Sequence, residues 1–158
     1  MEKAVLLKKA TVLLTYIGML CQGKPQYEAV REMMDDPDYY KYALGISYAI
    51  PSAETLRQRF DMIGDSLSDN EEKTVGIRTI YEITERTIDR YGQYHSEIKT
   101  DMDVERLPSG KFESNKLVLE LTMIAYNIFR IIGQESLKKK DAPGRKKIHR
   151  RRIRTMIR

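Results

Sequence analysis

A dense run of basic residues occupies the last part of the chain, and the chemistry open to it is the binding of phosphate groups. Residues 138–158 contain eleven Lys or Arg against Asp141 alone, a net charge of +10, so the rest of the chain carries −5 of the total of +5. Cations at this density neutralise the phosphates of a nucleic acid and release counterions, which makes binding strongly salt-dependent. The alternative is a disordered end with no specific partner. The basic residues are Lys138, Lys139, Lys140, Arg145, Lys146, Lys147, Arg150, Arg151, Arg152, Arg154 and Arg158.

A second candidate for nucleic-acid contact is the polar side of a helix expected over residues 53–63 and capped by Ser52. Its apolar face carries Leu56, Phe60 and Ile63. Its polar side carries Arg57, Gln58 and Arg59. In the major groove, arginine can donate two hydrogen bonds to guanine and glutamine can pair with adenine. Together with the short helices before it, this segment resembles a helix-turn-helix module. An ordinary amphipathic helix of a small bundle is the alternative.

Cysteine and histidine are too few for a disulfide framework or a zinc site. The only cysteine is Cys21, and the chain has two histidines. Cys21 lies in an apolar helical stretch, which suits a core residue in a reducing compartment. The first 20 residues carry lysines within their apolar part and lack a small-residue cleavage site, so they do not read as a signal peptide. We therefore expect one soluble domain of 158 residues in the cytoplasm.

Helical patterns account for the first part of the chain. Residues 4–22 place apolar side chains on one broad face, and Gly23 with Pro25 forms a stop signal. A second short helix is expected from Pro25 to the break at residues 35–37, and a third over residues 38–44, closed by Gly45.

The middle of the chain changes character. Residues 66–74 are polar and predict a linker, whereas residues 75–88 are rich in β-branched side chains and alternate as a strand does. Residues 89–93 would form the turn after it. No second strand is evident as a partner.

The longest apolar run predicts one helix over residues 114–137, with Ser114 as its cap. Its main stripe consists of Leu117, Leu121, Ile124, Ile128 and Ile131, widened by Val118, Ala125, Phe129 and Ile132. A helix this apolar belongs inside a larger fold, so we expect Leu121, Ile124, Ala125 and Ile128 to be among the most buried residues. A membrane span is the rival interpretation, but Glu120 and Arg130 interrupt the run below the ~20 apolar residues a bilayer requires.

Several words of the sequence resemble one protein family. HSEIKTD (residues 95–101), ERLPSGKF (105–112) and AYNIFRIIGQ (125–134) resemble the C-terminal part of bacterial insertion-sequence transposases of the DDE group 1 kind. QGKPQYEAV (22–30) and PSAETLRQRFD (51–61) resemble the start of the same family. The resemblance implies a ribonuclease-H-like domain in which two Asp and one Glu hold two Mg²⁺ ions that cut and rejoin DNA. It makes Glu97 the catalytic, metal-binding glutamate and the ends of an insertion sequence the DNA partner. The alternative for Glu97 is a solvated helix residue that pairs with Lys99 or His95.

The sequence departs from the family where the two aspartates should be. No long apolar strand ending in Asp lies between Asn70 and Tyr94. Asp101 and Asp103 follow Glu97 closely and suit loop-entry and cap positions, whereas a two-metal centre needs ligands from separate elements. We therefore interpret the chain as an internally deleted copy that retains no Mg²⁺.

The expected fold is mainly α with a small β remnant, an incomplete version of the ribonuclease-H-like α/β transposase fold preceded by a helical DNA-binding region. Its parts would be a helix-turn-helix-like region at 1–72, a strand remnant at 73–93, a core segment at 94–137 with a Glu-bearing helix and the long apolar helix, and a basic tail at 138–158. Three functions stay open: an active transposase, a non-catalytic DNA-binding fragment that modulates an intact transposase, and a poorly folded pseudogene product. Besides DNA, the protein partner expected is an intact transposase or another copy of the chain. No membrane partner is expected.

Overall fold

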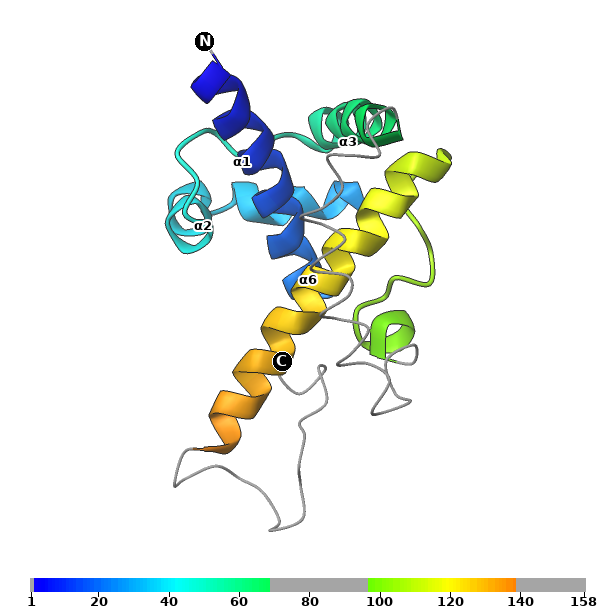
Figure 1. Ribbon diagram of the computed structural model, residues 1–158. Helices are drawn as coiled ribbons and strands as arrows, with labels where there is room; N and C mark the ends of the chain where they lie inside the picture. The colour runs from blue at the N-terminus through cyan, green and yellow to red at the C-terminus, as the bar shows by residue number, and fades with distance from the viewer. Residues whose placement is uncertain (1, 69–96, 139–158) are drawn as a thin grey trace.

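The computed structural model describes residues 2–68 and 97–138, which are mainly helical and contain no strand (Figure 1). The expectation of a mainly α fold is therefore confirmed for these residues. The strand expected within 73–93 lies outside them. The elements are α1 (Glu2–Cys21), the 3₁₀ helix η1 (Tyr27–Met34), α2 (Pro37–Leu44), α3 (Ala53–Ser68), the π-helical turn η3 (Glu97–Asp101) and α6 (Phe112–Leu137).

Helix α1 ends as its sequence predicts. Gly23 adopts a left-handed conformation with φ of 70°, which glycine takes without steric cost. The chain then turns back, and the Tyr16 hydroxyl donates a hydrogen bond of 2.6 Å to the carbonyl oxygen of Pro25. This bond fixes the start of the next segment against α1.

The second helix lies where it was predicted but is a 3₁₀ helix, a geometry that suits its apolar residues at every third position. Tyr27, Val30 and Met33 are all buried in η1. A 3₁₀ helix has three residues per turn, so residues at i, i+3 and i+6 align on one face. In an α-helix the same three side chains would spread over ~120° of the circumference, so the 3₁₀ helix aligns them more closely toward the core.

Helices α2 and α3 each begin with a side chain that caps the first turn. The side chain of Asp36 accepts a hydrogen bond from the Tyr39 amide at 3.2 Å, and Gly45 closes α2 with φ of 64°. At the start of α3, the Ser52 hydroxyl accepts a hydrogen bond from the Thr55 amide at 3.2 Å, which confirms Ser52 as the cap.

Three aromatic rings from three elements form the centre of the core. Tyr16 of α1, Tyr27 of η1 and Phe60 of α3 are fully buried, with ring centres 4.6 to 5.6 Å apart in tilted or edge-on contacts. Such geometry is the favourable one for aromatic pairs. Burial raises the pKa of both phenols far above the ordinary range, so they stay neutral. The cluster holds α1, η1 and α3 together.

Helix α6 lies across α1 and α3 (Figure 1) and begins earlier than predicted. It starts at Phe112, and Ser114 is not its cap: the buried hydroxyl of Ser114 donates a hydrogen bond to Asp61 of α3. The two helices cross closely at Gly64, where an added Cβ would lie 3.0 Å from backbone atoms of Glu113 and Ser114. Ser114 thus serves the packing of two helices.

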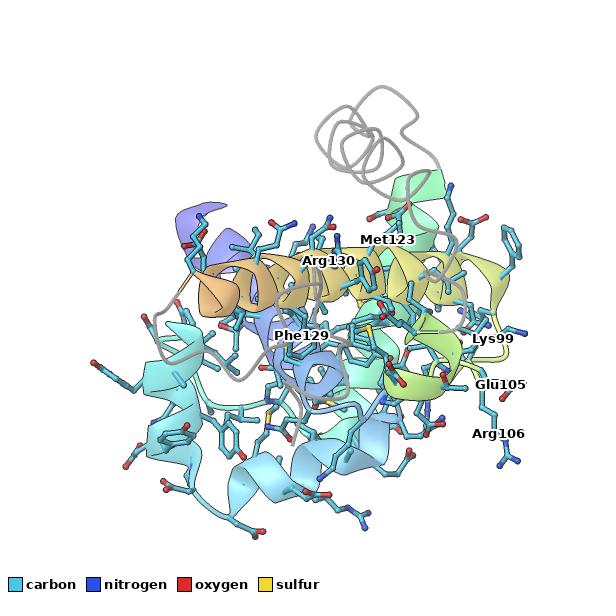
Figure 2. The ribbon with its side chains drawn as sticks, turned by 90° about the horizontal axis from the view of Figure 1, so that it is seen from below. Lys99, Glu105, Arg106, Met123, Phe129 and Arg130 are labelled. Atoms are coloured by element: carbon cyan, nitrogen blue, oxygen red, sulfur yellow. The ribbon has the colours of Figure 1, made fainter. Side chains whose placement is uncertain are left out.

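The buried stripe of α6 is rotated from the predicted one. Val118, Thr122, Ala125 and Phe129 form its inner side. Figure 2 shows Phe129 directed toward the rest of the molecule. Leu117 and Leu121 are also buried, but Ile124 is only partly buried, Ile128 is 37% exposed and Ile131 is 61% exposed. The expectation of burial is confirmed for Leu121 and Ala125 and is wrong for Ile124 and Ile128. The run is apolar around more than half of its circumference, so the positions of α1 and α3 decide which side is covered.

By length and composition alone, Phe112–Glu135 is the one helical stretch in the described part of the chain that could cross a membrane. Its most apolar stretch is 56% buried inside the protein. The core helix of a folded domain passes the same test.

Candidate functional site

Glu97 lies in the π-helical turn η3 and is completely buried. Its Oε2 accepts a hydrogen bond of 3.1 Å from the hydroxyl of Tyr126, which is itself buried on α6. The interpretation of Glu97 as a solvated helix residue is therefore wrong. The contact also joins two of the words described above, since Glu97 belongs to HSEIKTD and Tyr126 to AYNIFRIIGQ.

The nearby aspartates do not complete a metal centre with Glu97. Asp101 ends η3, and its Oδ2 is buried without a hydrogen-bond partner among the described residues. Asp103 is exposed in the loop that follows, with φ of 55°, a conformation that Asp tolerates better than most residues. No group of three or more His, Cys, Asp or Glu able to hold a metal ion occurs within residues 2–68 and 97–138. These residues do not fit the Mg²⁺ centre that the resemblance implies.

The three predicted base-contacting residues lie on the exposed side of α3, but in different environments. Arg57 is held by two carboxylates, at 2.8 Å from Glu28 and 3.1 Å from Glu54, and its guanidinium lies 5.9 Å from the ring centre of Tyr27. Gln58 donates a hydrogen bond of 2.9 Å to Glu54. Arg57 is thus neutralised locally, which leaves Arg59 as the more available of the two arginines.

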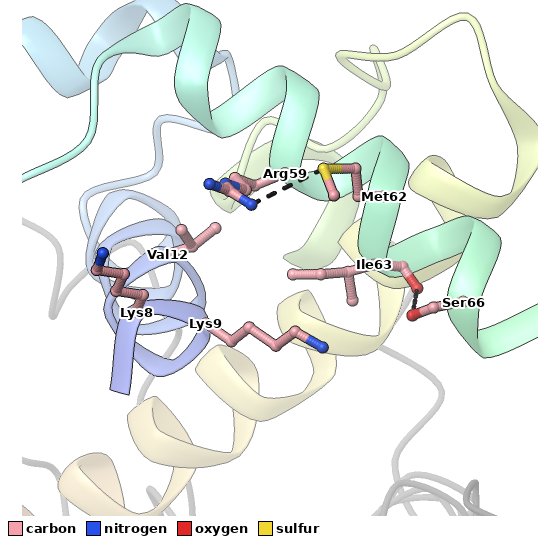
Figure 3. Close-up of a pocket in the computed structure, with 7 residues that line it drawn as sticks. All are labelled: Lys8, Lys9, Val12, Arg59, Met62, Ile63 and Ser66. Carbon is pink, nitrogen blue, oxygen red and sulfur yellow. Dashed lines mark hydrogen bonds between the residues drawn. The ribbon is translucent and has the colours of Figure 1, made fainter. Parts of the chain in front are cut away.

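Arg59 lies beside two lysines of α1 that the sequence analysis did not select. Together they border a cavity of about 400 Å³ between α1 and α3 (Figure 3). The cavity is lined by Lys8, Lys9, Val12, Arg59, Met62, Ile63 and Ser66, and we call it the cationic pocket. The sequence shows two adjacent lysines, Lys8 and Lys9, beside the apolar face of a helix. It does not show that this part of the helix packs against α3 next to Arg59.

Two basic residues outside the cationic pocket, Lys111 and Lys138, form ion pairs. Lys111, just before α6, lies 3.5 Å from Asp61 and 3.7 Å from Asp65, so it partly neutralises the acidic side of α3. Of the basic tail, Lys138 is the member the structure describes, and its ammonium group forms an ion pair of 2.5 Å with Glu135. The other predicted contacts of the tail, residues 139–158, lie outside the described residues.

Comparison with protein-family models, with curated proteins and with solved structures finds no match to the chain. A function must therefore be argued from the sequence words and from the geometry of Glu97, of α3 and of the cationic pocket.

Proposed function

We propose that the chain is a protein of the DDE transposase type that binds DNA without cutting it, in the cytoplasm of a bacterium. Its fold would be an incomplete version of the ribonuclease-H-like domain behind a helical DNA-binding region. The support for this ancestry is the order and spacing of the five sequence words, two of which are joined by the contact between Glu97 and Tyr126.

The burial of Glu97 is the main support for the proposal that the chain does not cleave DNA. A catalytic carboxylate must reach a metal ion and, through it, the scissile phosphate. Glu97 exposes no surface, and a phenol hydroxyl occupies one of its oxygens. A carboxylate in this position acts as a structural acceptor for α6, which agrees with the absence of the two aspartates from the sequence.

The support for DNA binding is the distribution of charge. The tail at 138–158 carries +10, and the described body adds Lys8, Lys9 and Arg59 at one opening. Cations grouped in this way favour the phosphate backbone irrespective of base sequence. The DNA proposed as the partner is the end of an insertion sequence, and no Mg²⁺ is required to bind it.

The test combines a nicking assay with a gel-shift titration. Supercoiled plasmid is incubated with Mg²⁺ or Mn²⁺ and either the parent protein or Glu97→Gln, and we expect no nicking from either. The same preparations should retard duplex DNA at low salt. Nicking by the parent that disappears in Glu97→Gln would contradict the loss of catalysis.

A second measurement separates a folded binding protein from a poorly folded product. Circular dichroism should show a helical spectrum and a cooperative thermal transition, because the core residues from α1, η1, α3 and α6 are mutually buried. A gradual transition without cooperativity would favour the poorly folded product. Absence of DNA retardation by a protein that melts cooperatively would contradict DNA binding.

A further inference from the structure

The lining of the cationic pocket follows from helical spacing on two facing helices. On α1, Lys8 and Lys9 precede Val12 by four and three residues, so both lie on its face and flank it. On α3, Arg59 precedes Met62 and Ile63 by three and four residues, which places it over the same apolar patch. The two helices therefore bring three cations around a shared apolar floor.

These cations lack the acidic partners that neighbouring cations have. Among the described residues, neither lysine nor Arg59 forms an ion pair; Arg59 has only a weak contact of 3.9 Å with the sulfur of Met62. By contrast, Arg57 lies only two residues before Arg59 and is held by two carboxylates. A group of unpaired cations on a body that is otherwise acidic marks a place where an anion is favoured.

The floor of the pocket adds a second requirement on the ligand. Val12, Met62 and Ile63 present apolar surface between the charged groups, and Figure 3 shows Arg59 and Lys9 on opposite sides of this surface. A volume of about 400 Å³ is within the range of small-ligand pockets, so it can admit more than an isolated inorganic ion. The fitting ligand is a phosphate joined to a group with C–H surface, as a deoxyribose is.

We propose that the cationic pocket holds one backbone phosphate of bound DNA between Lys8, Lys9 and Arg59, with the attached deoxyribose against Val12, Met62 and Ile63. This inference rests on the proposed DNA binding and adds a defined contact on the helical body. It assigns Arg59 to the backbone, in place of the base contact expected from its position on α3. Arg57 has no part in it.

The expected size of the effect follows from the number of phosphates involved. Each neutralised phosphate contributes about 0.9 to the log–log slope of affinity against salt, and so about eightfold in affinity at 0.1 M salt relative to 1 M. If three cations share one phosphate, removing all three should lower the slope by about 1. Three separate phosphate contacts would lower it by about 3.

The experiment measures fluorescence anisotropy of a labelled duplex with the full chain at several salt concentrations. The pocket variant combines Lys8→Gln, Lys9→Gln and Arg59→Gln. The charge-matched control combines Arg31→Gln, Lys99→Gln and Arg106→Gln, which also removes three exposed cations that form no ion pair among the described residues. Figure 2 shows Lys99 and Arg106 near η3, an element that does not line the pocket. Circular dichroism confirms that both variants fold.

A third variant tests the apolar floor. Met62 is 59% exposed, so Met62→Ser should not disturb the core. It should weaken DNA binding by about two- to fivefold, on the order of one lost methylene contact, and leave the salt slope unchanged because no cation is removed.

For the pocket variant we expect DNA affinity at 0.1 M salt to fall about eightfold and the log–log salt slope to fall by about 1. The charge-matched control should show clearly smaller changes in both. Equal changes in the two triple variants would overturn the pocket and leave DNA binding by general charge. A salt slope reduced by about 3 in the pocket variant would overturn the shared phosphate. A Met62→Ser variant that binds DNA like the parent would overturn the deoxyribose contact. A well-folded parent that binds no duplex at any salt would overturn the proposed function itself, and the two failures are therefore distinct.

Discussion

At the scale of single residues, the pairing of Glu97 with Tyr126 decides what a buried acidic group can do in this fold. A carboxylate removed from water needs hydrogen-bond donors to offset the loss of solvation. Tyr126 supplies one of them at 3.1 Å from the neighbouring helix. The bond offsets part of the cost of burial, and the buried carboxylate has no surface open to solvent.

Replacing Tyr126 with Phe tests this role. The variant removes the hydroxyl donor with little change in shape, and we expect the free energy of unfolding to fall by about 1–3 kcal/mol because a buried acceptor loses a partner. Urea denaturation at pH 7 measures the difference. Tyr42→Phe is the matched control, since Tyr42 is 88% exposed and should be silent. Equal stability of Tyr126→Phe and the parent would contradict the structural role of the bond.

Cys21 allows a test of burial through its reactivity. Burial raises the pKa of its thiol from an ordinary value of 9.0 to about 11, and only the thiolate reacts with a disulfide reagent. Because the pKa is raised, the neutral thiol persists to higher pH, and at pH 8 the thiolate fraction should be roughly 100-fold lower than in the unfolded chain. Labelling with a chromogenic disulfide in buffer and in guanidinium compares the two rates. A native rate equal to the denatured rate would show that Cys21 is solvated.

At the scale of elements, the crossing of α3 and α6 depends on Gly64. Alanine would normally favour a helix interior by about 1 kcal/mol over glycine. Here its Cβ would lie 3.0 Å from the backbone of Glu113 and Ser114, which cannot move without shifting α6. We expect this crowding to outweigh the propensity and to destabilise Gly64→Ala by about 1–2 kcal/mol in thermal or urea unfolding. Gly110→Ala is the control, because nothing lies within 4 Å of its added Cβ. A Gly64→Ala variant more stable than the parent would mean that the helices do not cross so closely.

The elements that the sequence predicts well are those whose signals are local. The cap at Ser52 and the stops at Gly23 and Gly45 all lie where their residue types place them. The errors concern relations between elements. Ser114 was predicted as a cap from its type, but it bonds to Asp61, which is 53 residues away in the chain.

The sequence identified candidate residues of the site, but not the contacts that these residues make in the fold. Glu97 was selected from a sequence word, yet its burial depends on Tyr126, 29 residues later. Arg59 was selected with Arg57 because both lie on the polar side of one helix. The packing of α3 against η1 pairs Arg57 with Glu28, whereas its packing against α1 places Arg59 beside Lys8 and Lys9.

At the scale of the whole molecule, the charge is divided between a cationic tail and an acidic remainder. Residues 139–158 contain ten Lys or Arg and one Asp, which is a net charge of +9. The whole chain has a net charge of +5, so the protein without these residues would carry −4. An acidic body is repelled by DNA at long range, and local cations must then act against this repulsion. The tail and the cationic pocket should therefore make separable contributions to binding.

Deleting residues 139–158 measures the contribution of the tail. With the eleven cations of residues 138–158 the parent could neutralise about 5–8 phosphates and show a log–log salt slope of about −5 to −7. The truncated protein should bind all sequences more weakly, with a slope near −1 that reflects the single phosphate proposed for the pocket. Adding the Lys8, Lys9 and Arg59 substitutions to the truncated chain should remove this remainder, whereas adding the Arg31, Lys99 and Arg106 substitutions should leave most of it. Anisotropy titrations on one duplex across the same salt range compare the four proteins. A truncated protein that kept the parental slope would show that the basic tail makes no contact with DNA.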